Sequence, residues 1–105
     1  MTEYRIVLST ASSEEEARRI AKEAVSKKLA ACVNIVPKIT SIYEWKDEVV
    51  EDSEVLMIFK TIGHDLLALE QLIKELHSYE VPEFVAIKID EGSEEYLRWI
   101  DGVLL

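Results

Sequence analysis

The densest group of chemically active side chains in the sequence lies between His77 and Glu83. The segment His77-Ser78-Tyr79-Glu80-Val81-Pro82-Glu83 places an imidazole, a phenol and two carboxylates around one proline. Such groups carry protons in catalysis or bind metal ions. A plain connector would instead be rich in Gly, Asn and Ser. The segment therefore indicates a site, although a charged His77 would also stabilise the end of a preceding helix through the helix dipole.

Two residues elsewhere in the chain add to the candidate chemistry. Cys32 supplies a thiol that could bind a soft ion such as Cu(I), although a free cysteine is also a common small core residue. Lys60 lies six residues after Glu54 on one expected strand, so both share a face. Lys60 could bind an anion in a cleft or form an ion pair with a carboxylate.

These residues form two predicted sets. The metal-binding set is Cys32, His77 and Glu83, and the ligand or cleft set is Lys60, Tyr79 and Glu54. The spacing of paired cysteines or histidines that is typical of a closed zinc site is absent from the sequence. A metal site is therefore expected to require residues from more than one subunit.

The elements that must position these residues can be predicted from their periodicity. Alternation predicts a strand over residues 4–10, and a Ser13–Glu16 capping box begins a helix with an apolar stripe. Two strands follow over 30–45 and 49–61, interrupted by a bulge or edge at Pro37 and joined by a turn at Lys46-Asp47-Glu48. Helical spacing predicts a second helix over 63–77, then a strand over 84–89 and a helix over 94–105.

This order predicts an α+β fold, a ferredoxin-like βαββαβ sandwich with a C-terminal helix, in one domain over residues 1–105. Helices cover only one face of such a sheet. The strand around Met57 is apolar on both faces, so its second face requires a cover. We therefore expect a homo-oligomer, with Tyr43, Trp45 and Met57 at the interface. A heteromeric partner stays open as the alternative.

The composition narrows the class of protein further. A net charge of −9 repels nucleic acid and anionic membranes, and the sequence contains no basic patch. Apolar runs fall short of the ~18 residues that span a bilayer. A single cysteine and an N-terminus unlike a signal peptide lead us to expect a cytoplasmic protein. The sequence contains neither a nucleophile elbow nor a phosphate loop, so we do not expect an enzyme.

Five blocks in order carry a family resemblance: ACVNIVP from Ala31, SIYEW from Ser41, EVLMIFKT from Glu54, HSYEVPE from His77, and YLRWI from Tyr96. Together they resemble the CutA family of divalent-cation tolerance proteins over nearly the whole chain. One departure is Asp47, where the family usually has Gly at the hairpin turn. Asp tolerates the left-handed conformation better than most residues, so the turn should survive with some strain.

The resemblance implies a tight homotrimer like that of the PII signalling proteins, and a role in tolerance of divalent metals such as copper. It brings no catalytic activity. The first functional hypothesis is a trimeric protein that binds copper or another divalent ion. The alternative is a PII-like sensor or scaffold whose intersubunit clefts bind a small anion or a partner protein. A chiefly structural trimer with an indirect link to metals is the third.

Overall fold

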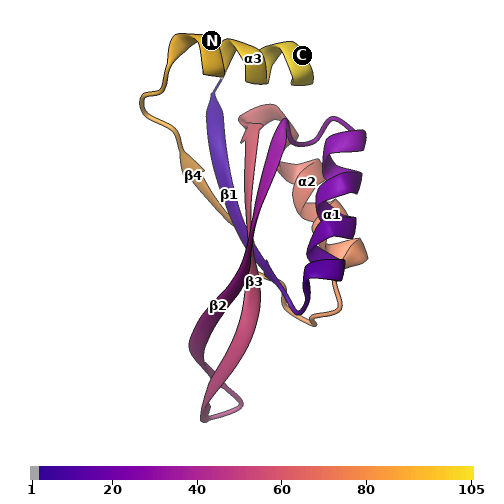
Figure 1. Ribbon diagram of the computed structural model, residues 1–105, viewed down its shortest axis with the longest axis vertical. Helices are drawn as coiled ribbons and strands as arrows, with labels where there is room; N and C mark the ends of the chain where they lie inside the picture. Colours follow the sequence, from indigo (N-terminus) through magenta and orange to yellow (C-terminus); the bar gives the residue numbers. More distant parts are fainter. Residues whose placement is uncertain (1–2) are drawn as a thin grey trace.

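The computed structural model describes residues 3–105, which form one four-stranded antiparallel sheet and three α-helices (Figure 1). The elements are β1 (Tyr4–Ala11), α1 (Glu14–Ser26), β2 (Cys32–Trp45), β3 (Glu48–Ile62), a 3-10 turn η1 (Gly63–Asp65), α2 (Leu66–Leu76), β4 (Val85–Lys88) and α3 (Glu94–Leu104). The strand order β2-β3-β1-β4 confirms the ferredoxin-like fold with a C-terminal helix. Met1 and Thr2, which belong to the segment compared with a signal peptide, lie outside the described residues.

Helices α1 and α2 cover one face of the sheet (Figure 1). Helix α1 begins as predicted, because the Ser13 hydroxyl accepts a hydrogen bond of 3.1 Å from the Glu16 amide. Its apolar stripe packs with that of α2 against alternate residues of β1 and β3. The core comprises Val7, Ala11, Ala17, Ile20, Ala24, Ala30, Val55, Met57, Phe59, Leu69, Leu72 and Ile73. None of the helices in the described residues is both long and apolar enough to cross a membrane.

Met57 belongs to this core, so its predicted place at a subunit interface is wrong. It pairs with Ser9 on one side and Ile35 on the other, and it is fully buried within the single chain. The error has a simple cause: successive strand residues point to opposite faces, and both faces of β3 are apolar here. Leu56 and Ile58, its neighbours, have the opposite parity and lie on the face that α1 and α2 leave open.

The open face carries a half-covered apolar surface. Helix α3 packs Ile100 against Ile62 and Ala31 at one end of the sheet. The remainder of the face stays partly exposed in the single chain and comprises Ile6, Leu8, Val36, Leu56, Ile58, Val85 and Ile87. The prediction that β3 is apolar on both faces is therefore confirmed, and the cover for its second face stays a prediction.

The far halves of β2 and β3 extend beyond the sheet as a long arm (Figure 1). A register shift between Val36 and Ile39 inserts one extra residue around Pro37. A one-residue shift exchanges the two faces of a strand. Beyond the bulge Ile39 pairs with Glu54, so the odd-numbered residues of β2 now share the open-face side, whereas Val33 before the bulge faces the helices.

The tip of the arm is a two-residue turn between Trp45 and Glu48, which pair with each other. Lys46 and Asp47 both have positive φ, 51° and 67°. Two consecutive positive φ values are typical of a type I′ turn, whose twist matches that of the flanking strands. The left-handed conformation predicted for Asp47 is thus confirmed.

Candidate functional site

The segment 77–83 begins where α2 ends. His77 is the C-cap and leaves the helix with extended dihedral angles, φ −83° and ψ 143°. Its side chain is completely buried. Nε2 lies 2.6 Å from the Thr10 carbonyl oxygen, and Nδ1 accepts a 3.0 Å hydrogen bond from the Tyr79 amide. These contacts select the neutral tautomer with its proton on Nε2, so neither ring nitrogen has a lone pair left for a metal ion.

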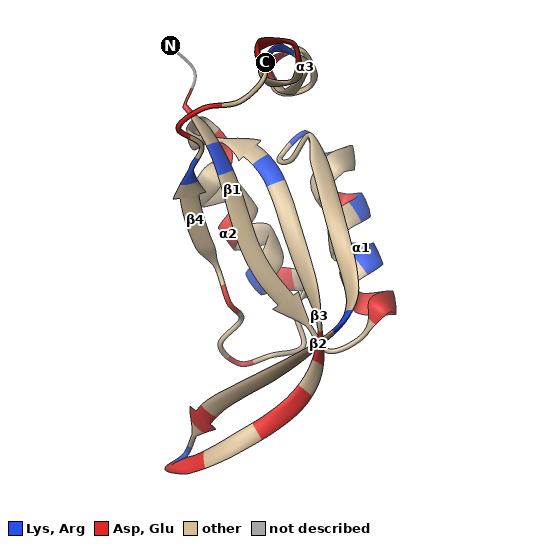
Figure 2. Cartoon of the chain, turned by 60° about the vertical axis from the view of Figure 1, so that its left-hand side comes forward, with Lys and Arg blue, Asp and Glu red and all other residues tan. Residues whose placement is uncertain are grey.

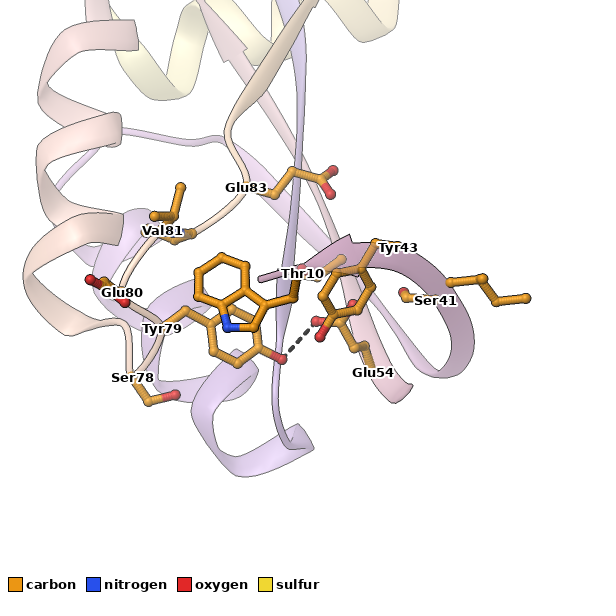
Figure 3. Close-up of a pocket in the computed structure, with 12 residues that line it drawn as sticks. Thr10, Ser41, Tyr43, Glu54, Ser78, Tyr79, Glu80, Val81 and Glu83 are labelled. Carbon is orange, nitrogen blue, oxygen red and sulfur yellow. Dashed lines mark hydrogen bonds between the residues drawn. The ribbon is translucent and has the colours of Figure 1, made fainter. Parts of the chain in front are cut away.

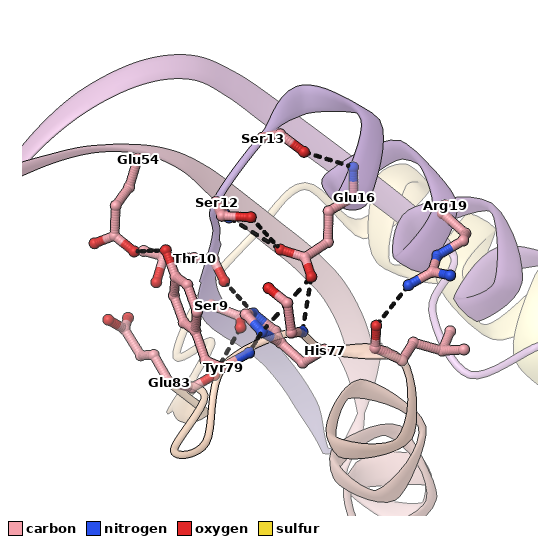
Figure 4. A network of polar contacts seen from close by, with 12 residues as sticks. Ser9, Thr10, Ser12, Ser13, Glu16, Arg19, Glu54, His77, Tyr79 and Glu83 are labelled. Atoms are coloured by element: carbon pink, nitrogen blue, oxygen red, sulfur yellow. Dashed lines mark hydrogen bonds and ion pairs between the residues drawn. The ribbon is translucent and has the colours of Figure 1, made fainter.

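Glu16 of α1 binds the same segment from the other side (Figure 4). Its Oε1 accepts hydrogen bonds from the amide and hydroxyl of Ser12, both 3.0 Å long, and its Oε2 accepts one of 2.8 Å from the Ser78 amide. The carboxylate also lies 4.0 Å from His77 Nδ1. Burial opposes its ionisation, but the hydrogen bonds from Ser12 and Ser78 outweigh burial and lower the pKa of Glu16 from 4.5 to about 2.

Tyr79 of this segment contacts Glu54 of strand β3. The Tyr79 hydroxyl donates a 2.6 Å hydrogen bond to Glu54 Oε2 (Figure 3). Burial and this hydrogen bond raise the pKa of Tyr79 well above its ordinary value, so the phenol stays a neutral donor. Glu54 itself is only 8% exposed. The Ser9 hydroxyl donates to the Glu83 carbonyl at 2.6 Å and holds the far end of the segment on β1.

A cavity of about 750 Å³ lies between this segment and the β2–β3 arm. Its lining comes from β1, both strands of the arm and the 78–83 loop, and comprises Thr10, Ser41, Ile42, Tyr43, Trp45, Glu54, Ser78, Tyr79, Glu80, Val81, Pro82 and Glu83. The bulge at Pro37 explains how Tyr43 and Trp45 come to share a side of the arm with Glu54. Figure 3 shows the Tyr43 ring beside the Tyr79–Glu54 pair.

Five of the nine predicted residues therefore meet at this cavity: Tyr43, Trp45, Glu54, Tyr79 and Glu83. Cys32 and Lys60 do not. They pair with each other near the α3 end of the open face. Lys60 is four residues further along β3 than Leu56, which pairs with the cavity residue Thr10. Lys60 Nζ contacts Asn34 Oδ1, and Cys32 Sγ lies 4.0 Å from the same oxygen. Within one subunit the predicted metal set of Cys32, His77 and Glu83 does not come together.

The donor atoms of the subunit do not fit a metal ion held by one chain. Across residues 3–105, no group of three or more His, Cys, Asp or Glu side chains is close enough to share one ion. Of the three predicted ligands, His77 uses both ring nitrogens inside the subunit. Glu83 is exposed at the cavity, and Cys32 is a half-buried free thiol on the open face. These two side chains keep their donor atoms available.

The sequence prediction missed Glu16 and Thr10 as parts of the site. A capping box alone would return the Glu16 side chain to the Ser13 amide. The side chain instead reaches the Ser12 amide and, across the fold, the Ser78 amide. Thr10 contributes a backbone carbonyl, which no residue type reveals. The sequence does carry a hint of the further role of Glu16. The first turn of α1 has three consecutive carboxylates, whereas a capping box uses only one.

The sequence matches the family model described as CutA1 divalent ion tolerance protein over residues 5–103. The chain belongs to the CutA1 family. A divalent-cation tolerance protein CutA of Thermus thermophilus is 56% identical over 95 residues, which cover 90% of this chain and 92% of that relative. Human Protein CutA is 47% identical over 94 residues, which cover 90% of this chain but 52% of the human protein, so the chain spans about half of it.

A solved CutA structure supports the same assignment. The protein from Archaeoglobus fulgidus, described as a periplasmic divalent cation tolerance protein, superposes on this CutA1-family chain with a TM-score of 0.94 at 40% identity. The alignment covers 97% of this chain and 99% of that structure. The family resemblance carried by the five sequence blocks is confirmed, and the family model and the Thermus relative are described as divalent ion and divalent-cation tolerance proteins.

Proposed function

We propose that the chain assembles as a homotrimer in the cytoplasm and that the trimer serves tolerance of divalent cations without catalysing a reaction. The observation that carries the assembly is the open face of the sheet. Seven apolar residues from all four strands lie there half-buried or exposed: Ile6, Leu8, Val36, Leu56, Ile58, Val85 and Ile87. Apolar surface gains roughly 25 cal/mol per Å² on burial, so a cover for this face is strongly favoured.

The arm supports the same proposal. It reaches beyond the sheet, which makes the subunit 44 Å long but only 25 Å and 22 Å across. Tyr43 and Trp45 are 40% and 43% exposed on it. Large aromatic side chains at this exposure are typical anchors of a subunit interface. Tyr43 and Trp45 therefore remain our proposed interface residues, and open-face residues such as Ile58 replace Met57.

Multi-angle light scattering tests the assembly. The expected mass is three times the chain mass of 12.0 kDa. Ile58→Glu would place a charge at the centre of the open face and should dissociate the trimer. Leu67→Glu is the matched control, because Leu67 is 69% exposed on α2, on the covered side of the sheet, and should leave the mass unchanged. A monomer for the parent protein at micromolar concentration would refute the proposal.

We propose further that divalent ions such as copper contact the assembled protein between subunits through Glu83 and Cys32. The support is chemical: a carboxylate suits hard and borderline ions, and a thiol suits Cu(I). The Glu83 side chain is exposed, and the Cys32 thiol makes only a long 4.0 Å contact with Asn34 Oδ1. His77 is withdrawn from the ligand set. The cavity of the single subunit does not support the anion-binding alternative, because Lys60 lies outside it. An intersubunit cleft at Lys60 stays a prediction.

Calorimetric titration of the assembled protein with Cu²⁺ tests the metal contact. Glu83→Gln and Cys32→Ser should each weaken binding, while Glu95→Gln, the same change on an exposed face of α3, should not. The absence of saturable binding at micromolar copper would mean that the link between this protein and metal tolerance is indirect.

A further inference from the structure

The cavity beside Tyr79 has an unusual charge balance. Its twelve lining residues include three carboxylates, Glu54, Glu80 and Glu83, and no Lys, Arg or His. The adjoining arm is acidic too, as Figure 2 shows. Between Ile39 and Glu54 the sequence contains six carboxylates and one basic residue, Lys46. A concave acidic wall of this kind concentrates cations and repels anions.

Glu54 is the decisive residue. It is buried to more than nine-tenths, and within residues 3–105 it has no ion-pair partner. Tyr79 donates one hydrogen bond to Oε2 but adds no charge. Buried carboxylates are normally paired with a cation or coordinated to one. Because Glu54 lines the cavity, the missing positive charge can be supplied from there.

Aromatic rings form the remaining walls. Tyr43, Trp45 and Tyr79 come from two different segments and line the same cavity. Figure 3 shows Tyr43 and Tyr79 on either side of Glu54. The negative faces of such rings attract cations, and Trp is the strongest of the three types. Lys46 Nζ already lies 5.9 Å from the centroid of the Trp45 ring, within the range of this attraction. Val81 and Pro82 add apolar surface.

Three classes of ligand can be compared with this lining. A small metal ion requires three or more donor side chains close together, and the described residues offer no such group. An anion would meet three carboxylates and no cation. A neutral apolar molecule would leave Glu54 without a counter-charge. A cation that carries its own apolar surface satisfies the carboxylates and the rings together.

We propose that this cavity binds an organic ammonium cation. The charged nitrogen lies near Glu54 and the aromatic rings, and the apolar groups of the ligand pack against Trp45, Val81 and Pro82. The volume of about 750 Å³ lies in the range of small-molecule sites, roughly 300–1,000 Å³. The inference requires the cavity-facing sides of Tyr43 and Trp45, which are also proposed interface residues, to stay open in the native assembly. It does not rest on metal binding. The absence of copper binding would refute the metal proposal and leave the ammonium site untouched.

Calorimetric titration of the protein in its native assembly with choline tests the site. The matched control ligand is dimethylbutanol, in which a carbon atom replaces the ammonium nitrogen. Choline should bind saturably, and dimethylbutanol should bind about tenfold more weakly because it lacks the charge. Glu54→Gln and Glu83→Gln should each weaken choline binding, and Trp45→Leu should do so while keeping an apolar wall. Glu95→Gln, on α3, should leave it unchanged.

Four results would overturn the proposal. Equal binding of choline and dimethylbutanol would make the cavity a general apolar pocket. Saturable binding of inorganic phosphate that choline does not disturb would make it an anion site. No saturable binding of choline to the native assembly would mean that a neighbouring copy or the arm itself fills the space. Choline binding that survives both Glu54→Gln and Trp45→Leu would place the ligand elsewhere.

Discussion

Replacing Glu16 by Gln should destabilise the protein at neutral pH and leave it almost unaffected in acid. Glu16 joins the start of α1 to the segment that follows α2, because its two oxygens accept hydrogen bonds from Ser12 and Ser78. Gln is the same size but carries no charge. One of its two terminal atoms becomes an N–H donor, which would face the donor groups of Ser12 or of Ser78.

The size of the effect follows from the pKa of the carboxyl group. Hydrogen bonds in the folded state lower the pKa of Glu16 from 4.5 to about 2 in spite of burial. A depressed carboxyl pKa contributes stability at pH values above the unfolded pKa, and that contribution is lost as pH falls toward the folded pKa. The shift corresponds to about 3 kcal/mol at pH 7, at about 1.4 kcal/mol for each pKa unit. The loss should occur between about pH 4.5 and about pH 2.

Urea denaturation of the parent protein and of Glu16→Gln from pH 7 down to pH 2 measures this difference. Subunit concentration must be held fixed, because assembly adds to the apparent stability. The gap between the two proteins should be about 3 kcal/mol at pH 7 and close toward pH 2. Glu15→Gln, an exposed carboxylate of the same helical turn, is the control and should cost less than about 0.5 kcal/mol. A gap that stays constant across the range would show that Glu16 acts through packing rather than through its charge.

Three further substitutions test the fold and the site. Asp47→Gly removes the strain of a positive φ of 67°, so the free energy of unfolding should stay the same or rise by up to about 1 kcal/mol, and the melting temperature should not fall. A clear drop in melting temperature would contradict the type I′ turn. Met57→Ala should cost about 2–5 kcal/mol in denaturation yet leave the mass by light scattering unchanged, whereas dissociation would restore Met57 to an interface. Tyr79→Phe removes the donor to buried Glu54 and should cost about 1–3 kcal/mol, and equal stability would mean that water replaces the phenol.

The local signals in the sequence predicted the elements well because they depend on neighbours along the chain. The Ser13 cap, the turn at Asp47 and the bulge near Pro37 all lie where residue chemistry requires them. Helix α2 is shorter than predicted. Gly63–Asp65 forms a 3-10 turn before the helix begins at Leu66, and His77 is its cap rather than its last residue.

The site was harder to predict because it depends on which face of each strand a residue occupies. Val33, Tyr43 and Trp45 are all odd-numbered, so an unbroken strand would place them on one face. The extra residue at Pro37 reverses that parity for the far half of β2. Consequently Val33 packs under the helices, while Tyr43 and Trp45 lie beside Glu54. The sequence indicated the bulge but not its consequence for the two aromatic residues.

His77 shows why a cluster of titratable residues in the sequence need not be a reactive cluster in space. Its imidazole is enclosed by Thr10, Glu16 and Tyr79, so it orients the segment instead of facing the cavity. The titratable groups that line the cavity from the segment are Tyr79, Glu80 and Glu83. Because His77 and Glu16 fix the backbone from beneath, the Tyr79 phenol reaches Glu54 across the sheet. The polar network under the segment is therefore the support of the site, and the acidic, aromatic cavity above it is where a ligand would make contact.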